Sequence, residues 1–372
     1  MKVTIERSVF LKALSHVQSV VERRNTIPIL SNVLLNAEGG QLGLTATDLD
    51  MEISETAPAD VAEPGAATTS AHTLYEIVRR LPEGAQVRLE LVAGEARLKL
   101  AAGRSDFSLA VLPNDDFPTM DADDLGVQFA APAAELKRLI DKTRFAISTE
   151  ETRYYLNGIY LHPYLQGGTP SLRAVATDGH RLARVDADLP DGAADMPGVI
   201  APRKAIGELR RLLEDAGDTV SVAVSDAKIR FAFDNVVLTS KLIDGTFPDY
   251  ERVIPSGNDK MMKVENADFI SAVDRVSTVS AEKTRSVKLA MEADRLRLAV
   301  NNPESGSALE ELSVEYGAEA IEIGFNARYL MDVAKEVDGA TSTFKFADSA
   351  SPTLILDEED PRALYVLMPM RV

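Results

Sequence analysis

The chain repeats itself at a spacing of roughly 130 residues, and self-similarity at such a period indicates tandem structural units. The same interval separates Asp48 in "LGLTATDLDMEI" from Asp178 in "LRAVATDGHRLARV", and Phe117 in "LPNDDFPTM" from Phe247 in "LIDGTFPDY". A third copy follows. The segment "ARYLMDVAKEV" resembles "AIGELRRL" and lies a slightly shorter interval after it, and "LRLAVNNPE" resembles "LRAVATDGH". The helix and strand patterns are interrupted by the loop-like segments "DADDLG" (121–126) and "PSGNDK" (255–260), so we expect domains at 1–124, 125–255 and 256–372.

Each unit shows the same succession of local patterns. Apolar residues in 7–24 recur at helical spacing (Val9, Phe10 or Leu11, Leu14, Val17, Val20 and Val21), with Ser8 available as the N-cap. A second helix is predicted at "LYEIVRRL", from Leu74, and "AIGELRRL", from Ala205, answers it in the next unit. The segments between the helices alternate apolar and polar residues around Gly-containing turns, which is typical of antiparallel strands. We therefore predict an α+β unit of two helices and about eight strands, with the helices covering one face of the sheet.

Composition excludes several classes of chemistry. The 372-residue chain has no cysteine, so disulfides, thiolate nucleophiles and Cys-ligated zinc or iron–sulfur sites are excluded. The four histidines show no metal-ligand spacing, and we expect no cofactor. No apolar run approaches the roughly 18 residues of a membrane span, and no cleavable leader is evident. The expectation is a cytoplasmic protein with no membrane partner.

Positive charge is concentrated in the predicted helices. The net charge is −18, yet residues 7–24 carry +3, 135–144 +2, 74–80 +1 and 203–211 +3, while 268–285 and 328–336 sum to zero. The helices thus hold +9 and the remaining residues −27. One interpretation is that Lys and Arg are simply good helix formers. The alternative is that the helices share a basic face directed at a polyanion, while the acidic sheets face outward.

Asp178 and His180 suggest a hydrolase, because His is the side chain that most readily moves protons near neutral pH. However, the sequence has no G-x-S-x-G elbow, P-loop or G-x-G-x-x-G. The repeat-equivalent of His180 is Asp50, which favours a structural "TD" turn. The hydrolase alternative predicts turnover that is lost in His180→Ala.

The whole chain resembles the bacterial DNA polymerase III beta subunit, the replicative sliding clamp. The resemblance is carried by "TIPILSNVLL", "TATDLDMEI", "GRSDFSL", "RYYLNG", "ATDGHRLA", "PRKAIGEL", "FPDYERVIP", "NNPE" and "YVLMPMRV" in this order. It implies the DNA clamp fold: a head-to-tail homodimer whose six domains close into a ring, with helices lining the hole. It also implies a non-enzymatic processivity factor that encircles double-stranded DNA without sequence preference, in the cytoplasm and at nucleoid-associated replication forks.

The resemblance further implies a peptide-binding pocket between the second and third domains. Its expected partners are the DNA polymerase III alpha subunit, the clamp loader delta subunit, other polymerases, and repair or mismatch-repair factors that carry clamp-binding peptides. The matching residues are Leu156, Thr177, Gly179, His180, Arg181, Leu182, Pro248, Arg252, Val253, Val366, Met368, Pro369 and Met370. Met side chains adapt to varied apolar partners, and His180 and Arg181 can supply polar contacts. Without the resemblance, the C-terminal methionines would be interpreted as core.

Two further sets of residues match family positions. For DNA these are Arg24, Arg203, Lys204 and Arg211, with Arg153, Tyr154 and Tyr155 resembling a loop that meets single-stranded template. "STEET" (148–152) departs from the pattern of that loop. For the dimer interface they are Phe107 and Leu109 facing Thr278 and Val279; Thr278, Val279 and Thr284 stand where bulkier apolar residues are common. We therefore expect a dimer that dissociates readily. A non-replicative scaffold is the remaining alternative, in which reversing Arg24 and Lys204 leaves DNA-dependent functions intact.

Overall fold

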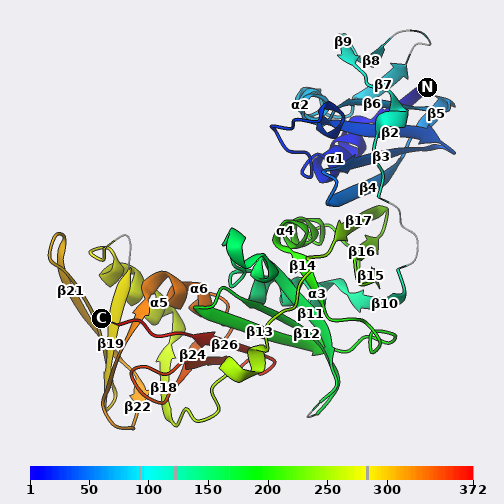
Figure 1. Cartoon of the computed structure of the whole chain (residues 1–372). Coiled ribbons are helices and arrows are strands. Elements are labelled where there is room, and N and C mark those ends of the chain that lie inside the picture. The colour runs from blue at the N-terminus through cyan, green and yellow to red at the C-terminus, as the bar shows by residue number, and fades with distance from the viewer. Residues whose placement is uncertain (92–93, 95, 121–124, 167, 282–284, 372) are drawn as a thin grey trace. The chain divides into compact units, whose positions relative to one another are not determined.

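The computed structural model describes residues 1–91, 94, 96–120, 125–166, 168–281 and 285–371. By its internal contacts the chain forms two compact units. The first comprises Met1–Ala134, Pro190–Pro197 and Lys204–Leu242; the second comprises Glu135–Leu189, Gly198–Arg203 and Ile243–Val372. Each is described by itself (Figure 1).

Six α-helices occur in the described residues, two in each repeat. They are α1 (Arg7–Val17), α2 (Ala71–Arg80), α3 (Ala133–Arg144), α4 (Arg203–Leu212), α5 (Asn266–Ser277) and α6 (Ala327–Ala334). Short 3-10 helices lie at Pro28–Ser31, Asn114–Asp116, Glu151–Leu156 and Tyr250–Val253. The three-repeat α+β architecture expected from the sequence is confirmed.

The start of α1 differs from the expectation. Its N-cap is Glu6, whose Oε2 accepts hydrogen bonds from the backbone N–H groups of Ser8 (2.8 Å) and Val9 (3.1 Å). The prediction of Ser8 as the cap was wrong because the longer, anionic side chain before it already satisfies the free N–H groups and complements the helix dipole. Of Phe10 and Leu11, the two alternatives for one position of the apolar stripe, Phe10 is the buried residue. Val9, also expected in the stripe, is exposed.

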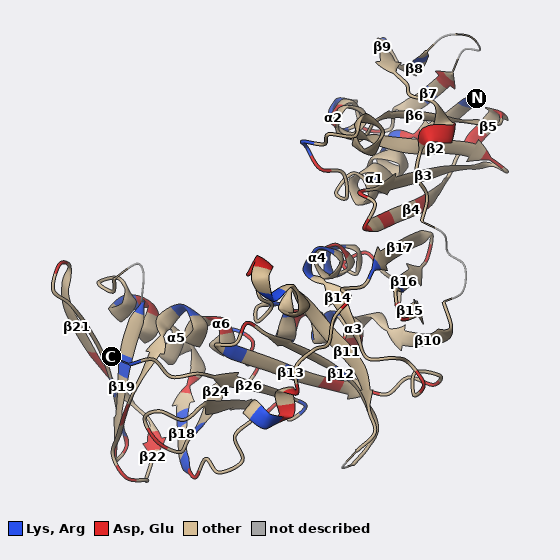
Figure 2. Ribbon diagram, in the orientation of Figure 1, with Lys and Arg blue, Asp and Glu red and all other residues tan. Residues whose placement is uncertain are grey.

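Two helices end earlier than predicted. The α1 helix stops at Val17 and α5 at Ser277, so Arg24 lies in the loop that follows α1. With these bounds the six helices carry +7 instead of +9. Most of that charge lies on α4 and on α1 and α3, and the basic residues of α4 are visible in Figure 2. The two helices of the third repeat sum to −1, so they add no positive charge.

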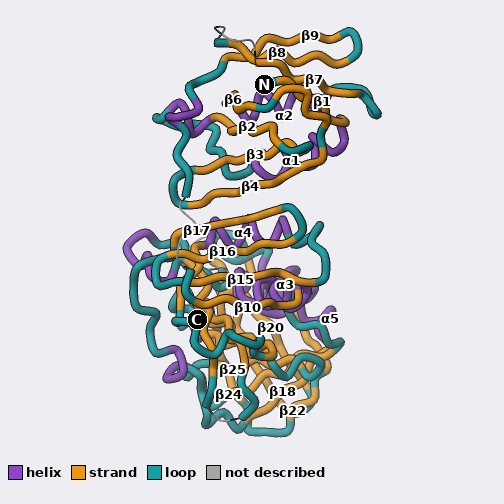
Figure 3. Tube along the Cα trace, turned by 90° about the vertical axis from the view of Figure 1, so that its right-hand side faces the viewer, coloured by secondary structure: helices purple, strands orange, loops and turns teal. Residues whose placement is uncertain are grey.

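The first unit contains two antiparallel sheets. One has the order β5-β1-β7-β8-β9 and the other the order β10-β15-β16-β17-β4-β3-β2-β6. The strands are β1 (Lys2–Glu6), β2 (Asn32–Glu38), β3 (Gln41–Thr47), β4 (Met51–Pro58), β5 (Asp60–Glu63), β6 (Gly65–Ser70), β7 (Gln86–Leu91), β8 (Arg97–Ala102), β9 (Ser105–Ala110), β10 (Val127–Pro132), β15 (Thr219–Val224), β16 (Lys228–Phe233) and β17 (Val236–Lys241). Figure 3 shows β10, β15, β16 and β17 lying side by side in the second sheet.

The second unit contains the other two sheets, with orders β14-β11-β12-β13-β26-β25-β24-β18-β22 and β21-β20-β19-β23. Their strands are β11 (Gly158–Tyr164), β12 (Ser171–Thr177), β13 (Arg181–Asp188), β14 (Val199–Pro202), β18 (Lys260–Glu265), β19 (Ser286–Glu292), β20 (Arg295–Asn302), β21 (Gly306–Ser313), β22 (Glu315–Tyr316), β23 (Ile321–Asn326), β24 (Thr341–Phe346), β25 (Thr353–Asp357) and β26 (Ala363–Leu367).

Strand pairing joins each repeat to the next. In the first unit β4 pairs antiparallel with β17, with Ile53 opposite Leu238. In the second unit β13 pairs antiparallel with β26, with Ala183 opposite Tyr365. Ile53 and Ala183 are separated by the same interval as Asp48 and Asp178, and they therefore occupy equivalent places. The same strand of each repeat thus carries the junction to the following one.

Ion pairs reinforce the junction in the second unit. Lys142 of α3 is 5% exposed, and its Nζ lies 2.7 Å from Oδ2 of Asp338 and 3.2 Å from Oδ2 of Asp360. Arg138, one turn earlier, binds Asp360 at 2.7 Å. Burial, together with the nearby charge of Asp141, raises the pKa of Glu336 to about 7. One acid of this junction therefore titrates near neutral pH.

We predict that Glu336→Gln changes the pH dependence of stability. An unfolded glutamate has a pKa of about 4.3, so the raised folded value means that folding favours the protonated acid. Its contribution is complete below about pH 4.3 and is lost as the pH rises through about 7. Because the side chain is partly exposed, we expect wild type to lose about 1–2 kcal/mol relative to the variant between pH 5 and pH 8. Urea denaturation at both values measures this.

The exposed Glu319→Gln is the control for the Glu-to-Gln change itself. Parallel pH profiles for Glu336→Gln and wild type would contradict the prediction.

Candidate functional site

The segment 177–181 is a tight turn built around Asp178. Its Oδ1 accepts hydrogen bonds from the backbone N–H groups of His180 (2.9 Å) and Arg181 (3.1 Å), and its Oδ2 accepts one from Nε of Arg181 (3.1 Å). Asp side chains stabilise turns in this way. Asp48 accepts from Asp50 (2.9 Å) and Met51 (2.7 Å) in the equivalent turn of the first repeat. Asp178 therefore has the structural role that the repeat indicated.

Gly179 lies at the tip of this turn. Its φ of +87° lies in the left-handed region, which favours glycine. Leu49, the equivalent residue, adopts a φ of +78° despite its side chain. A Cβ at Gly179 would stand 2.6 Å from Nη1 of Arg153, so any other residue there would displace the Arg153 guanidinium from its place beside the turn.

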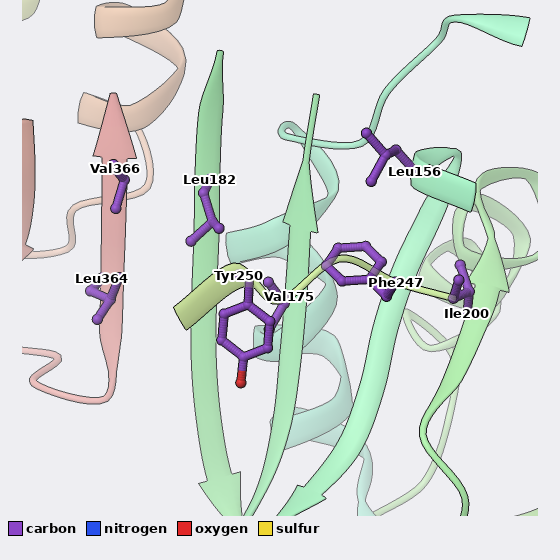
Figure 4. Close-up of a cluster of buried hydrophobic side chains, with 8 residues drawn as sticks. All are labelled: Leu156, Val175, Leu182, Ile200, Phe247, Tyr250, Leu364 and Val366. Carbon is purple, nitrogen blue, oxygen red and sulfur yellow. The ribbon is translucent and has the colours of Figure 1, made fainter. Parts of the chain in front are cut away.

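Beside the turn lies a cluster of buried apolar side chains from β12, β13, β14 and β26, from the 3-10 helix Glu151–Leu156, and from the segment that contains Phe247 and Tyr250. Its members, shown in Figure 4, are Leu156, Val175, Leu182, Ile200, Phe247, Tyr250, Leu364 and Val366. Three of the residues predicted for the peptide pocket (Leu156, Leu182 and Val366) thus lie together in one cluster. The sequence analysis missed the other five, although Phe247 and Tyr250 belong to the quoted "FPDYERV".

Other residues of the predicted pocket are accessible. Val253 is 48% exposed and Met368 38%, which is high for large apolar side chains, and Pro248 and Arg252 are also exposed. Pro369 and Met370 are half-buried. The backbone N–H of Met368 donates to the carbonyl of His180 at 2.8 Å and thereby attaches the C-terminal segment to the turn. A buried apolar floor with exposed Val and Met at its margin suits an apolar peptide.

The two polar residues of the turn differ in accessibility. Arg181 is 9% exposed and donates to Oδ2 of Asp332 (2.6 Å) and to the carbonyl of Phe145 (2.6 Å) as well as to Asp178. Its guanidinium therefore fastens β13 to α6. His180 is exposed and stacks on Tyr329 of α6, with 6.2 Å between ring centroids. The sequence analysis did not identify Tyr329 as a neighbour of this turn. Tyr329 belongs to a helical apolar pattern, and that pattern does not distinguish a residue beside a site from a core residue.

Three of the predicted DNA contacts lie in the first unit. Arg24 is exposed, and no acidic partner is recorded for it in the described part of the chain. Lys204 is also exposed, but its Nζ binds Glu22 (3.2 Å) and Asp48 (2.5 Å). Arg211 donates to Ser19, Glu208 and the carbonyl of His16, so it joins α4 to α1. Arg24 is the best placed of the three to meet phosphate.

The other four lie in the second unit. Arg203 is exposed, Tyr154 is 54% exposed, and Tyr155 meets Tyr154 edge-on with ring centroids 5.8 Å apart. Arg153 is bound to Glu150 at 2.5 Å, within the acidic loop where the sequence departs from the family pattern. An exposed tyrosine beside an arginine is compatible with stacking on a base.

The residues predicted for the dimer interface lie on the edge strand β9 and at the end of α5. Phe107 and Leu109 are on β9, which has a strand partner on one side only in the described residues. Between β9 and α2 lies a mainly apolar groove of about 480 Å³, lined by Ile77, Leu81, Pro82 and Phe107 among others. Thr278 caps the end of α5 and is exposed, Val279 follows it, and Thr284 lies outside the described residues. Sequence analysis missed Leu309 on β21, which is 62% exposed.

Among the described residues, no group of three or more His, Asp or Glu side chains could hold a metal ion. None of the helices in that part of the chain has both the length and the apolar character needed to cross a membrane.

We predict that Asp178→Ala lowers the free energy of unfolding by about 1–3 kcal/mol, because three donors lose their acceptor. The exposed Asp191→Ala is the control and should change stability little. Chemical denaturation compares the two variants. An Asp178→Ala protein as stable as wild type would contradict the structural role and favour the hydrolase alternative.

Comparison with known proteins covers the chain from end to end. Models of the DNA polymerase III beta subunit match in order: the N-terminal domain at residues 1–121, the central domain at 130–249 and the C-terminal domain at 251–371. The curated beta sliding clamp of Caulobacter vibrioides is 60% identical over 372 residues, which is 100% of both chains.

Solved structures agree. Caulobacter crescentus pol III beta superposes with a TM-score of 0.96 at 60% identity, covering 100% of both chains. A DnaN sliding clamp from Bartonella birtlesii, bound to griselimycin, gives 0.97 at 51% identity over 100% of both chains. Three consecutive domain models and relatives of this identity over the full length show that the chain belongs to the DNA polymerase III beta subunit family, the bacterial sliding clamps.

Proposed function

We propose that two copies of this chain close head to tail into a ring that encircles duplex DNA and tethers replication proteins to it. The family is the processivity subunit of DNA polymerase III and is not catalytic, so the chain is not an enzyme. Its partners are DNA, polymerase and a second copy of itself. Each copy supplies three domains, which we place at 1–124, 125–255 and 256–372.

The observation that carries the proposal is the repeated strand junction. Within the chain β4 pairs with β17 and β13 with β26. The equivalent strand of the third repeat is β21, and it lies at a sheet edge in the described residues, as does β9 of the first repeat. Exposed edges of this kind pair readily with another strand. Pairing of β21 with β9 of a second copy extends the same junction and, repeated at both ends, closes a ring.

Repeat equivalence also gives the register of this third junction. At the two junctions inside the chain, Leu238 lies opposite Ile53 and Tyr365 lies opposite Ala183. Phe107 is the first-repeat equivalent of Leu238, and Ala308 is the third-repeat equivalent of Ile53 and Ala183. Phe107 of one copy is therefore expected opposite Ala308 of the other. The groove between α2 and β9 then faces the end of α5, where Thr278 and Val279 lie.

The DNA contacts in this proposal are loose and directed at phosphates. Arg24 and Arg203 are exposed cations without recorded acidic partners in the described residues, and Lys204 and Arg211 are largely occupied by protein groups. Contacts of this type position DNA without reading its sequence. Topological enclosure, rather than affinity, provides processivity.

The apolar cluster and its exposed margin form the partner site. The partners we propose for it are the DNA polymerase III alpha subunit, the clamp loader delta subunit, and other polymerases and repair or mismatch-repair factors with clamp-binding peptides. Met368 and Val253 supply adaptable apolar contacts, His180 supplies a polar one, and Arg181 holds the turn in place. The protein would act in the bacterial cytoplasm, at replication forks on the nucleoid.

We predict retention on DNA by topology. The protein is loaded onto nicked circular DNA by its ATP-dependent loader, separated from free protein by gel filtration at moderately high salt, and the circle is then cut once. Bound protein should remain on circles and leave cut DNA rapidly, because a ring slides off free ends. Equal retention on both shapes would mean ordinary contact and would favour the scaffold alternative.

A second prediction concerns the strength of the ring. Thr278 and Val279 offer less apolar surface than bulkier residues, so the dimer should dissociate more readily than one with leucine there. Thr278→Leu should lower the dimer dissociation constant roughly tenfold, in line with one additional buried aliphatic side chain at each of two interfaces. Sedimentation from micromolar to nanomolar concentration measures it. Wild type that shows no monomer at nanomolar concentration would refute the prediction.

A further inference from the structure

A basic residue recurs at one place in the first helix of every repeat. The tenth residue of α1 is His16, that of α3 is Lys142 and that of α5 is Arg275. In all three cases the preceding strand ends immediately before the helix, so the three positions correspond without any insertion or deletion. The first two residues contact acids of the following repeat within the same chain.

In the first unit His16 connects two acids from different repeats. Its Nδ1 lies 2.7 Å from Oε2 of Glu55, on β4 of its own repeat. Its Nε2 lies 3.3 Å from Oδ2 of Asp215, which follows the end of α4 in the next repeat by three residues. Both His16 and Glu55 are buried. The basic residue at this position therefore joins one repeat to the next.

In the second unit Lys142 makes the same connection. Its Nζ lies 2.7 Å from Oδ2 of Asp338, four residues after the end of α6 in the next repeat. The place of Glu55 is taken here by Val185, the equivalent position on β13, so the second repeat has no acid at that point of its own strand. The acid that follows the next repeat's second helix is therefore the partner common to both junctions.

In the third repeat only half of this arrangement is present. Nε of Arg275 lies 3.1 and 3.2 Å from the two carboxylate oxygens of Glu310 on β21, the strand equivalent to β4. No contact is recorded for Nη1 of Arg275 with any described residue. The second acid of this arrangement would come from a following repeat, and the 372 residues contain three repeats.

In a head-to-tail dimer the next repeat is the first repeat of the other copy. The residue three positions after the end of α2 is Glu83, which is exposed and has no recorded ion pair among the described residues. It directly follows Leu81 and Pro82, which line the groove beside β9. Glu83 thus matches Asp215 and Asp338 in charge and in its place shortly after the preceding helix.

We propose that Arg275 of one copy pairs with Glu83 of the second copy, so that the contact between a basic residue and an acid of the next repeat, found at both junctions inside the chain, also fastens the junction between chains. The proposal rests on the head-to-tail dimer and adds the charged pair that fixes partner and direction. Opposite charges at such a seam select the correct orientation, because head-to-head association would not bring these two residues together.

The first test is charge reversal at Glu83. Because Glu83 has no ion pair with the described residues of its own chain, the substitution breaks no such contact within the monomer. Since the pair occurs at both seams of the dimer, Glu83→Arg should raise the dimer dissociation constant roughly five- to thirtyfold at low salt, and less at high salt. Glu38→Arg is the matched control, because Glu38 is equally exposed, lies on the other sheet of the first unit and gives the same change in net charge. Sedimentation measures both variants, and thermal melting verifies that they fold.

The second test is pair-specific. Arg275→Glu alone should weaken the dimer, and the double variant Glu83→Arg with Arg275→Glu should regain most of the lost affinity. When the two single variants are mixed, one seam of the mixed dimer joins the two reversed residues and the other joins the two native ones, so both seams have opposite charges. Each homodimer, in contrast, has like charges at both seams. Native mass spectrometry should therefore find mixed dimers above the statistical fraction.

The outcomes separate the two proposals. If wild type does not dimerise, the proposed ring fails. If wild type dimerises while Glu83→Arg behaves like Glu38→Arg, or if mixed dimers form only at the statistical fraction, the ring stands and the Arg275–Glu83 pair is refuted.

Discussion

Antiparallel pairing between strands of successive repeats is the constraint on which the rest of the structure depends. The β4·β17 and β13·β26 ladders turn separate sheets into continuous ones and leave a strand edge at β9 and another at β21 within the described residues. An edge strand carries unpaired N–H and C=O groups that favour another strand. In the proposed ring, a second copy of the chain supplies the missing partner for each of these two edges.

Side chains at these junctions do more than fill space. His16 and Lys142 each connect a helix of one repeat to an acid of the next, and Arg211 joins α4 to α1. Buried charges are costly unless they are paired, so such contacts specify one arrangement of neighbouring repeats more than they add stability. The same logic explains why several basic residues that seemed available for DNA are engaged with protein groups.

The turn at 177–181 illustrates how one repeated element acquires a function in one copy. Asp48 and Asp178 hold their turns by the same backbone hydrogen bonds. In the first repeat Lys204 binds Asp48, whereas in the second the turn carries His180 at its surface and receives the C-terminal segment. The apolar cluster and exposed methionine beside it make this copy, and not the other, the candidate partner site.

The sequence by itself determined the three repeats, the α+β class, the structural nature of the "TD" turn and the absence of cysteine chemistry, because these depend on local periodicity and residue type. Through the family resemblance it also singled out Leu156, Leu182 and Val366, which the structure brings together in one buried cluster. It gave the wrong cap for α1 and ended α1 and α5 too late, since a short-range pattern does not show where the last hydrogen-bonded turn lies. Only the tertiary structure decided which Lys and Arg side chains are paired with acidic residues of the chain. Arg181 meets Asp332, 151 residues away, and Lys204 meets Asp48, 156 residues away. Pairings at such separations depend on how sheets bring distant segments together, which periodicity cannot encode.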